Sequence, residues 1–250
     1  MKYSSFIVLL FFILIPFSSR AQDVSNSLTF RLPDGASKAP VVLILEGTGG
    51  SRGVPSNWAR FFADRGIATV QIHSAAARGR SNWAGTGCEL QYGRDIRRVL
   101  TILAERPEFD VTRFAIMGMS RGATEALGHG FDFAGAAHKP AAVFALYPGC
   151  GGICTTDWPR HAPDTHVEIL YGAADEWGTY QRNRDACRRL AGANVRFHEF
   201  AGAHHGFDGT SSGQFSAGGS SFRYAPDAEA LTAAQRIVAE RLAQAWGTRP

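Results

Sequence analysis

The sequence has little excess charge of either sign. It contains 26 Lys and Arg residues against 22 Asp and Glu, a formal net charge of +4. Residues 1–21 carry a leader pattern, and their removal leaves 24 basic residues against 22 acidic, a balance of +2. The local cluster of Arg182, Arg184, Arg188 and Arg189 lies on a predicted helix, where a solvated face explains it. Nucleic-acid binding needs a basic surface, so no nucleic-acid partner is expected.

The sequence also lacks an apolar run long enough to span a bilayer. The run from Phe6 to Phe17 is about a dozen residues, short of the roughly 20 that a spanning helix needs. Lys2 precedes it, and the small residues Ser19 and Ala21 follow at the positions that a signal peptidase recognises. This pattern favours a secretory signal peptide over a permanent anchor. We expect cleavage after Ala21 and a secreted or periplasmic mature protein without a membrane span.

Cysteine is scarce, with four residues: Cys88, Cys150, Cys154 and Cys187. An even count in a chain that leaves the cytoplasm favours two disulfides. Zinc is the alternative, but the Cys150-Gly-Gly-Ile-Cys154 spacing has no matching Cys/His pair at finger-like distance, so no metal site is predicted. Four cysteines allow three pairings. The sequence does not choose among them, although Cys150 with Cys187 and Cys88 with Cys154 is the preferred set.

Short aliphatic runs alternate with longer stretches of helical period, which is typical of a mostly parallel sheet covered by helices on both faces. The predicted strands are 28–32, 41–46, 67–72, 113–117, 141–146, 167–171 and 195–200. The predicted helices are 56–65, 89–105, 121–130, 179–192 and 227–246. Residues 206–224 are rich in Gly and Ser without periodicity and are expected to form a loop. With no internal repeat or linker, residues 22–250 are expected to form one α/β domain.

A Gly-x-Ser-x-Gly segment, Gly118-Met-Ser-Arg-Gly122, directly follows a predicted strand and precedes a predicted helix. In a nucleophile elbow, a strained turn at this place lifts the serine hydroxyl above the sheet, and the flanking glycines avoid a clash. The five-residue pattern alone is common by chance, so its position between strand and helix carries the argument. Ser120 is the predicted nucleophile.

A serine nucleophile needs a histidine base and an acid that orients the base. With an elbow of this kind the chain order is Ser, acid, His. Asp175 and His205 each follow a predicted strand in that order, so both are expected at the sheet edge where Ser120 lies. Alone, each is explained as a turn former or a surface histidine, but the three together favour a triad. The neighbouring Glu176 and His204 are the alternatives.

A tetrahedral intermediate also needs backbone donors for its oxyanion. One is expected from the amide of Arg121, next after the nucleophile. The other is expected from the glycine-rich loop after strand 41–46, with Thr48 as first choice and Gly47 as second. An ordinary glycine-rich turn is the alternative for that loop.

These segments together resemble the dienelactone hydrolase-like branch of the α/β-hydrolases, from about Pro40 to the last helix. The resemblance rests on Glu46-Gly-Thr-Gly-Gly50, Gly118-Met-Ser-Arg-Gly122, Tyr147-Pro-Gly-Cys150, Gly172-Ala-Ala-Asp175 and Gly202-Ala-His-His-Gly-Phe207. It implies the α/β-hydrolase fold and cofactor-free hydrolysis of an ester, lactone or similar acyl bond. In that family the histidine precedes a small residue and Phe, which matches His205. The namesake enzymes carry Cys at the nucleophile position, so dienelactone itself is not expected as the substrate.

Four further residues are candidates for contact with the substrate or nucleophile. In the resemblance, Glu46 stands where a Glu lies near the nucleophile, and a structural role at the strand end is the alternative. Arg78 could hold a substrate carboxylate with its forked donors, and a surface arginine is the alternative. Trp83 and Trp177 could line an apolar acyl pocket, and packing under the loops is the alternative.

The sequence therefore predicts an exported carboxylic-ester hydrolase that takes a small acyl substrate without a cofactor. An amidase or peptidase could use the same triad, and a binding protein could keep the scaffold without catalysis. The sequence does not indicate the oligomeric state.

Overall fold

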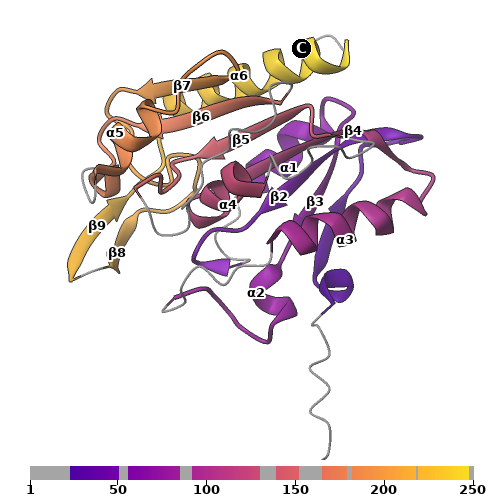
Figure 1. The fold of residues 1–250 in the computed structure, drawn as a ribbon, viewed down its shortest axis with the longest axis horizontal. Coiled ribbons are helices and arrows are strands. Elements are labelled where there is room, and N and C mark those ends of the chain that lie inside the picture. Colours follow the sequence, from indigo (N-terminus) through magenta and orange to yellow (C-terminus); the bar gives the residue numbers. More distant parts are fainter. Residues whose placement is uncertain are drawn as a thin grey trace, which may run out of the picture.

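The computed structural model describes residues 23–50, 56–84, 92–129, 139–151, 165–178, 182–217 and 219–247. They contain a seven-stranded sheet in the order β1-β3-β2-β4-β5-β6-β7 (Figure 1). Its strands are β1 (Leu28–Arg31), β2 (Ala39–Leu45), β3 (Ala68–Ile72), β4 (Phe109–Met119), β5 (Ala142–Leu146), β6 (His166–Gly172) and β7 (Val195–Phe200). The edge strand β1 pairs antiparallel with β3, and the other neighbours pair parallel. The predicted mostly parallel α/β fold is confirmed.

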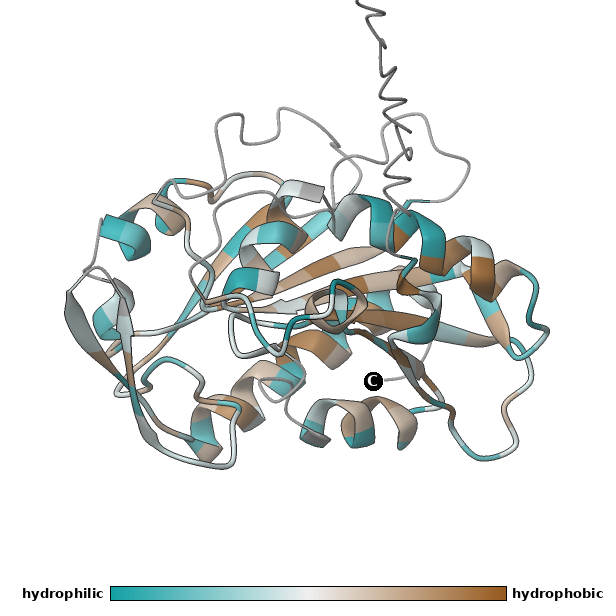
Figure 2. Cartoon of the chain, turned by 90° about the horizontal axis from the view of Figure 1, so that it is seen from below, coloured by the Kyte–Doolittle hydropathy of each residue, from teal (hydrophilic) through white to brown (hydrophobic). Residues whose placement is uncertain are grey.

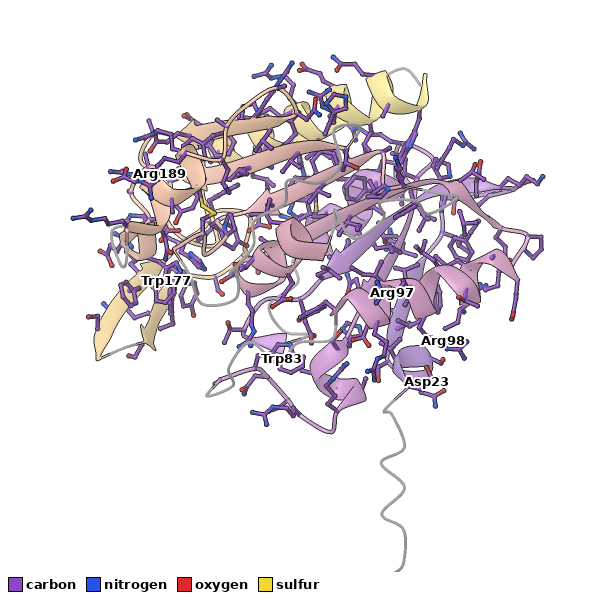
Figure 3. The ribbon with its side chains drawn as sticks, in the orientation of Figure 1. Asp23, Trp83, Arg97, Arg98, Trp177 and Arg189 are labelled. Atoms are coloured by element: carbon purple, nitrogen blue, oxygen red, sulfur yellow. A yellow bond between two sulfur atoms is a disulfide. The ribbon has the colours of Figure 1, made fainter. Side chains whose placement is uncertain are left out.

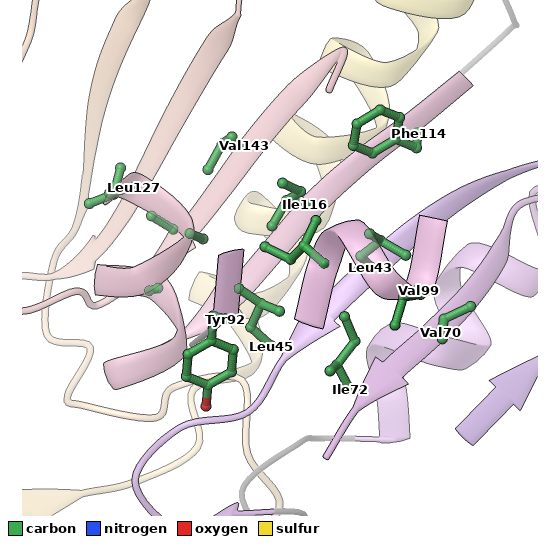
Figure 4. Close-up of a cluster of buried hydrophobic side chains, with 14 of the residues drawn as sticks. Leu43, Leu45, Val70, Ile72, Tyr92, Val99, Phe114, Ile116, Leu127 and Val143 are labelled. Atoms are coloured by element: carbon green, nitrogen blue, oxygen red, sulfur yellow. The ribbon is translucent and has the colours of Figure 1, made fainter. Parts of the chain in front are cut away.

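The central strands are apolar along their whole length because helices cover both faces of the sheet. Every residue of β2 and of β5 is buried. Leu43, Ile116 and Val143, from the adjacent strands β2, β4 and β5, belong to one buried cluster, seen in Figure 4. The edge strand β7 instead mixes half-buried and exposed residues. Burial therefore concentrates on the central strands of the sheet and falls off at the β7 edge.

Helices pack on both faces of the sheet. The helices are α1 (Ser56–Ala63), α2 (Ser74–Ala77), α3 (Tyr92–Ala104), α4 (Arg121–His129), α5 (Asn183–Arg188) and α6 (Ala228–Trp246), with 3₁₀ turns at Val24–Asn26 and Glu176–Gly178. α3, α4 and α5 contribute to one buried cluster, whereas α1 and α6 contribute to the other. Figure 2 shows hydrophobic strands between helices that carry hydrophilic residues on their outer sides. The prediction of helices on both faces is confirmed.

The predicted strands and most predicted helices lie within a few residues of their observed positions. The prediction for 179–192 is too long, because within the described part of that range α5 spans only Asn183–Arg188. The prediction of a loop over 206–224 is wrong, because β8 (Gly213–Ala217) and β9 (Ser220–Tyr224) form an antiparallel hairpin. Phe215 and Phe222 pair across it and pack together. Cross-strand packing of this kind stabilises a hairpin despite a Gly/Ser-rich composition.

One buried ion network ties the sheet to the last helix. The side chain of Glu168 on β6 accepts hydrogen bonds from Arg241 Nε at 2.6 Å, and its other oxygen lies 2.6 Å from His198 Nε2. Burial alone would raise the pKa of Glu168, but the hydrogen bonds outweigh burial and hold the pKa below its ordinary value. Glu168 therefore remains charged between its two partners.

A disulfide joins Cys150, in the loop after β5, to Cys187 on α5 across 37 residues of sequence. The preferred pairing is confirmed for these two cysteines, and Cys88 and Cys154 lie outside the described residues. Beside the bridge, the amide of Gly151 donates to Asn183 Oδ1 at 2.8 Å. The loop after β5 is thus held to α5 by a covalent bond and by a hydrogen bond.

The predicted leader, residues 1–21, lies outside the described residues. Among the residues that are described, no helix is both long enough and apolar enough to cross a membrane.

Replacing both bridged cysteines, Cys150→Ala/Cys187→Ala, should lower the free energy of unfolding by about 2–4 kcal/mol, because a closed loop of this length restricts the unfolded chain. Urea denaturation of the native and doubly substituted proteins under non-reducing conditions measures the difference. Equal stability of the two proteins would contradict a contribution of this bridge to the fold.

Candidate active site

Ser120 lies at the sharp turn between β4 and α4. Its backbone adopts a positive φ of +51°, a conformation that non-glycine residues rarely take. The turn is fixed on both sides, because the Ser120 amide donates to the Leu146 carbonyl at 2.9 Å and its carbonyl accepts from the Thr124 amide at 3.0 Å. A strained serine between a buried strand and a helix is the geometry of a nucleophile elbow.

The two glycines of the motif are required by close backbone packing. A Cβ atom at Gly118 would overlap the carbonyl group of Gly122, and one at Gly122 would overlap the carbonyl oxygens of Leu45 and Glu46. The helix that follows Ser120 therefore lies directly against the end of β2. No larger residue fits at either position without a shift of the backbone.

The structure brings the three predicted triad residues together. His205 Nε2 lies 3.0 Å from Ser120 Oγ, and His205 Nδ1 lies 2.9 Å from Asp175 Oδ2. Asp175 follows β6 and is held in place because its other oxygen, Oδ1, accepts from the Trp177 amide at 2.9 Å. Both His205 and Asp175 are buried. A serine hydroxyl and a carboxylate are thus linked through the two nitrogens of one imidazole, the arrangement that a Ser-His-Asp triad requires.

The sequence neighbours Glu176 and His204 take no part in this chain of contacts. Glu176 is exposed and accepts a hydrogen bond from the Arg223 amide at 2.9 Å. His204 Nδ1 is buried and has no hydrogen-bond partner among the described residues. Of each predicted pair of neighbours, the preferred residue is the one that joins the Ser120 network.

The loop after β2 places Gly47 next to the elbow. A Cβ atom at Gly47 would lie 3.5 Å from Ser120 Cβ and 3.1 Å from the Met119 carbonyl oxygen. Thr48 is exposed, and its carbonyl accepts from the Trp83 amide at 2.8 Å. Arg121, the first residue of α4, follows Ser120 directly. Gly47 and Arg121 therefore flank Ser120, while Thr48 lies one residue further along the loop.

Solved structures with similar folds include several hydrolases. A protein designated a dienelactone hydrolase, from Klebsiella pneumoniae subsp. pneumoniae, is similar with a TM-score of 0.63 and 19% identity, over 87% of this chain and 92% of that one. Esterase 2 of Thermogutta terrifontis, phosphorylated by paraoxon, is similar with a TM-score of 0.61 and 18% identity, over 89% and 90% of the two chains. The chain has the α/β-hydrolase fold.

The similarity to these hydrolases is seen in the fold and not in the sequence. No family model and no curated protein matches this sequence. The resemblance to dienelactone hydrolase-like proteins is thus confirmed at the level of the α/β-hydrolase fold.

Within this hydrolase fold, Glu46 supports the loops beside the elbow. Its side chain is fully buried, and Oε1 accepts from the Ala75 amide at 2.6 Å and from the Trp83 indole at 3.1 Å. Its backbone carbonyl accepts from the Tyr92 hydroxyl at 3.1 Å. These contacts support the structural alternative for Glu46. They also explain Trp83, which is 4% exposed and packs beneath the loop.

Arg78 forms an ion pair with Asp95 instead of facing open solvent. Its two terminal nitrogens lie 2.9 and 3.1 Å from the two carboxylate oxygens of Asp95. Asp95 is buried and also accepts from the Ser74 hydroxyl at 2.5 Å. This network anchors α2 to α3 and accounts for Arg78 without a substrate carboxylate.

Trp177 belongs to an aromatic group beside His205. Its ring lies 5.0 Å from Phe222 and 5.9 Å from Phe215, both on the β8–β9 hairpin, and Figure 3 shows Trp177 next to that hairpin. The Phe215 ring is also 5.1 Å from the His205 imidazole. The β8–β9 hairpin, which the sequence analysis did not predict, therefore brings an aromatic surface to the His205 ring.

Sequence reasoning also missed Asp208, a carboxylate with no exposed surface. It accepts hydrogen bonds from the Tyr147 hydroxyl at 2.6 Å and from the Trp58 indole at 2.7 Å. Burial raises the pKa of Asp208 above its ordinary value, although the two hydrogen bonds favour the charged form. Burial and the nearby Asp208 charge raise the pKa of Tyr147 far above its ordinary value, so the phenol stays protonated as a donor.

The substitution Gly122→Ala should destabilise the protein by about 1–3 kcal/mol, because the added methyl group overlaps backbone carbonyls that cannot rotate away. Gly128→Ala is the matched control on the same helix, since among the described residues no atom outside the neighbouring backbone lies within 4 Å of its added Cβ. Alanine is the better helix former, so this variant should gain up to about 1 kcal/mol. Thermal or urea unfolding measures both, and equal effects of the two substitutions would contradict the close packing at the elbow.

Proposed function

We propose that this protein is an exported carboxylic-ester hydrolase with Ser120 as nucleophile, His205 as base and Asp175 as orienting acid. The observation that carries the proposal is the chain of contacts from Ser120 Oγ through both imidazole nitrogens to Asp175, at 3.0 and 2.9 Å. The strained turn at Ser120 supports it independently, because backbone strain of this kind clusters at active sites.

In this mechanism His205 takes the hydroxyl proton while Ser120 Oγ bonds to the acyl carbon of the ester. The imidazolium then donates that proton to the leaving alcohol as the tetrahedral intermediate collapses to an acyl-enzyme. Water, deprotonated by the same imidazole, attacks the acyl carbon, and the released Ser120 oxygen recovers the proton. Asp175 stabilises the imidazolium and fixes its tautomer through the bond to Nδ1.

The oxyanion is assigned to the Arg121 amide and to an amide of the Gly47–Thr48 loop. Arg121 is the residue after the nucleophile, whose amide takes this role at a nucleophile elbow. On the loop, the close approach of Gly47 to Ser120 favours its amide over that of the exposed Thr48. Two backbone donors on rigid elements stabilise the developing negative charge without reorganisation.

We expect the substrate to carry an apolar substituent that packs against the aromatic group of Trp177, Phe215 and Phe222. This expectation is supported by the contact between the Phe215 ring and the His205 imidazole, beside which the acyl or alcohol part of a small ester would bind. Export is supported by the leader pattern and by the disulfide Cys150–Cys187, because disulfides persist in oxidising compartments. The paraoxon adduct of the Thermogutta terrifontis esterase suggests an organophosphorus reagent as the first probe.

A fluorophosphonate probe should label native protein on Ser120, and the label should be absent in Ser120→Ala and His205→Ala. Esterase kcat in His205→Ala should fall about 10³-fold or more, because removal of one triad member removes the concerted proton transfer. Peptide mapping locates the adduct, and matched 4-nitrophenyl esters and anilides distinguish esterase from amidase activity.

Asp175→Asn should lose most of the activity. Glu176→Gln is the matched control and should keep it, since Glu176 neighbours Asp175 but is exposed and outside the proposed triad. Correctly folded native protein that takes no label and hydrolyses neither substrate would favour a binding protein on a hydrolase scaffold.

A further inference from the structure

A second buried carboxylate, Asp208, lies behind His205 on the same loop. The two residues are three positions apart, and both are buried. Tyr147 connects the two residues. The centroid of its ring is 4.5 Å from that of the His205 imidazole, and its hydroxyl donates to Asp208 Oδ1 at 2.6 Å. Tyr147 thus contacts the proposed base with its ring and the buried carboxylate with its hydroxyl.

The carboxylate also joins three separate elements of the fold. Asp208 Oδ2 accepts from the Trp58 indole of α1 at 2.7 Å, and the Asp208 carbonyl accepts from Asn57 Nδ2 at 2.7 Å. Tyr147 directly follows β5 and has a positive φ of +42°, which costs about 1–3 kcal/mol and persists only when the surroundings hold it. The histidine loop, α1 and the end of β5 therefore meet at this one side chain.

We infer that Asp208 is a positioning residue that acts through Tyr147 to hold the His205 imidazole in line with Ser120 and Asp175. This inference rests on the proposed function, in which His205 is the base. It assigns to Asp208, a second carboxylate besides Asp175, a part in positioning that base. The Tyr147 ring packs against the imidazole and limits its tilting, and the hydrogen bond from its hydroxyl to Asp208 holds that ring in place.

The charged and titratable groups around this unit are few. Among the described residues, Asp208 is coupled electrostatically to Tyr147 and to His205, and Tyr147 is also coupled to Asp175. The side chains of α1 that contact Asp208, Asn57 and Trp58, are neutral. Substitution of Asp208 therefore changes the support of Tyr147 while the direct contact of His205 with Asp175 stays intact.

The test compares Asp208→Asn, Tyr147→Phe and the double variant with native protein. Asparagine keeps the volume but offers one acceptor oxygen to two donors, so kcat on a 4-nitrophenyl ester should fall about tenfold with KM within twofold. Tyr147→Phe keeps the ring and should lower kcat about threefold. The kcat of the double variant should be no lower than that of Asp208→Asn alone, because both substitutions break the same hydrogen bond between Tyr147 and Asp208.

Glu168→Gln is the matched control, since it also replaces a buried carboxylate that has two hydrogen-bonding partners. Those partners, Arg241 and His198, lie outside the proposed triad. It should lower the melting temperature and leave kcat within twofold. If Asp208→Asn and Tyr147→Phe behave as Glu168→Gln does, or if their effects on kcat multiply in the double variant, Asp208 does not act through Tyr147 and the inference is overturned.

The NMR resonances of the His205 imidazole separate this inference from the proposed function. In Asp208→Asn these resonances should move from their native positions, because the support through Tyr147 is changed, whereas Glu168→Gln should leave them in place. Moved resonances in a protein without esterase activity would uphold the positioning and reject the proposed function. Unmoved resonances in an active enzyme would overturn the inference and keep the proposed function.

Discussion

The left-handed turn at Ser120 is the constraint on which the rest of the candidate site depends. For a serine, the left-handed backbone conformation costs about 1–2 kcal/mol relative to the right-handed one, so the surrounding structure must stabilise it. It is held by the packing of Gly118 and Gly122 against each other and against the end of β2. The same packing brings the Gly47 loop to the nucleophile. Strain at one residue and close approach of two backbones are therefore one structural feature.

The surroundings of the turn are held by polar contacts that connect several strands. Thr124, one turn after Ser120, exchanges hydrogen bonds with both the amide and the carbonyl of Gly149. The next residue, Cys150, is bonded covalently to α5. On the other side, Asp208 links the histidine loop to α1 and to the end of β5. Rigid support of this kind matters because a displacement of about 1 Å at a reacting group can lower a rate about 100-fold.

Much of the fold and of the candidate site could be predicted because both depend on local patterns. Strands such as β2 and β5 are buried on both faces, so they appear as continuous apolar runs. Ser120, Asp175 and His205 follow the parallel strands β4, β6 and β7, and parallel strands bring their carboxyl ends to one edge. The hairpin of β8 and β9 was missed because its Gly and Ser content masked the pairing of Phe215 with Phe222. Gly-Gly at 218–219 between two short runs was a hairpin signal that could have revealed it.

The contacts of individual side chains could not be predicted in the same way. Arg78 and Trp83 both follow β3 in the sequence. Whether their side chains face a substrate or a buried carboxylate depends on the positions of Asp95 and Glu46, which the sequence does not reveal. Asp208 carries no sequence signal that separates it from a surface aspartate, because its burial is created by Trp58 and Tyr147 from distant segments. Such residues become visible only when tertiary contacts are known.

The central claim, a covalent acyl-enzyme on Ser120, is tested most directly by rapid quenching during turnover of 4-nitrophenyl acetate, followed by mass spectrometry of the protein and its peptides. The account predicts a burst of about one 4-nitrophenol per protein and an acetyl group on the peptide that contains Ser120, both absent in Ser120→Ala. Turnover without an adduct, or an adduct that persists on another residue in Ser120→Ala, would contradict it.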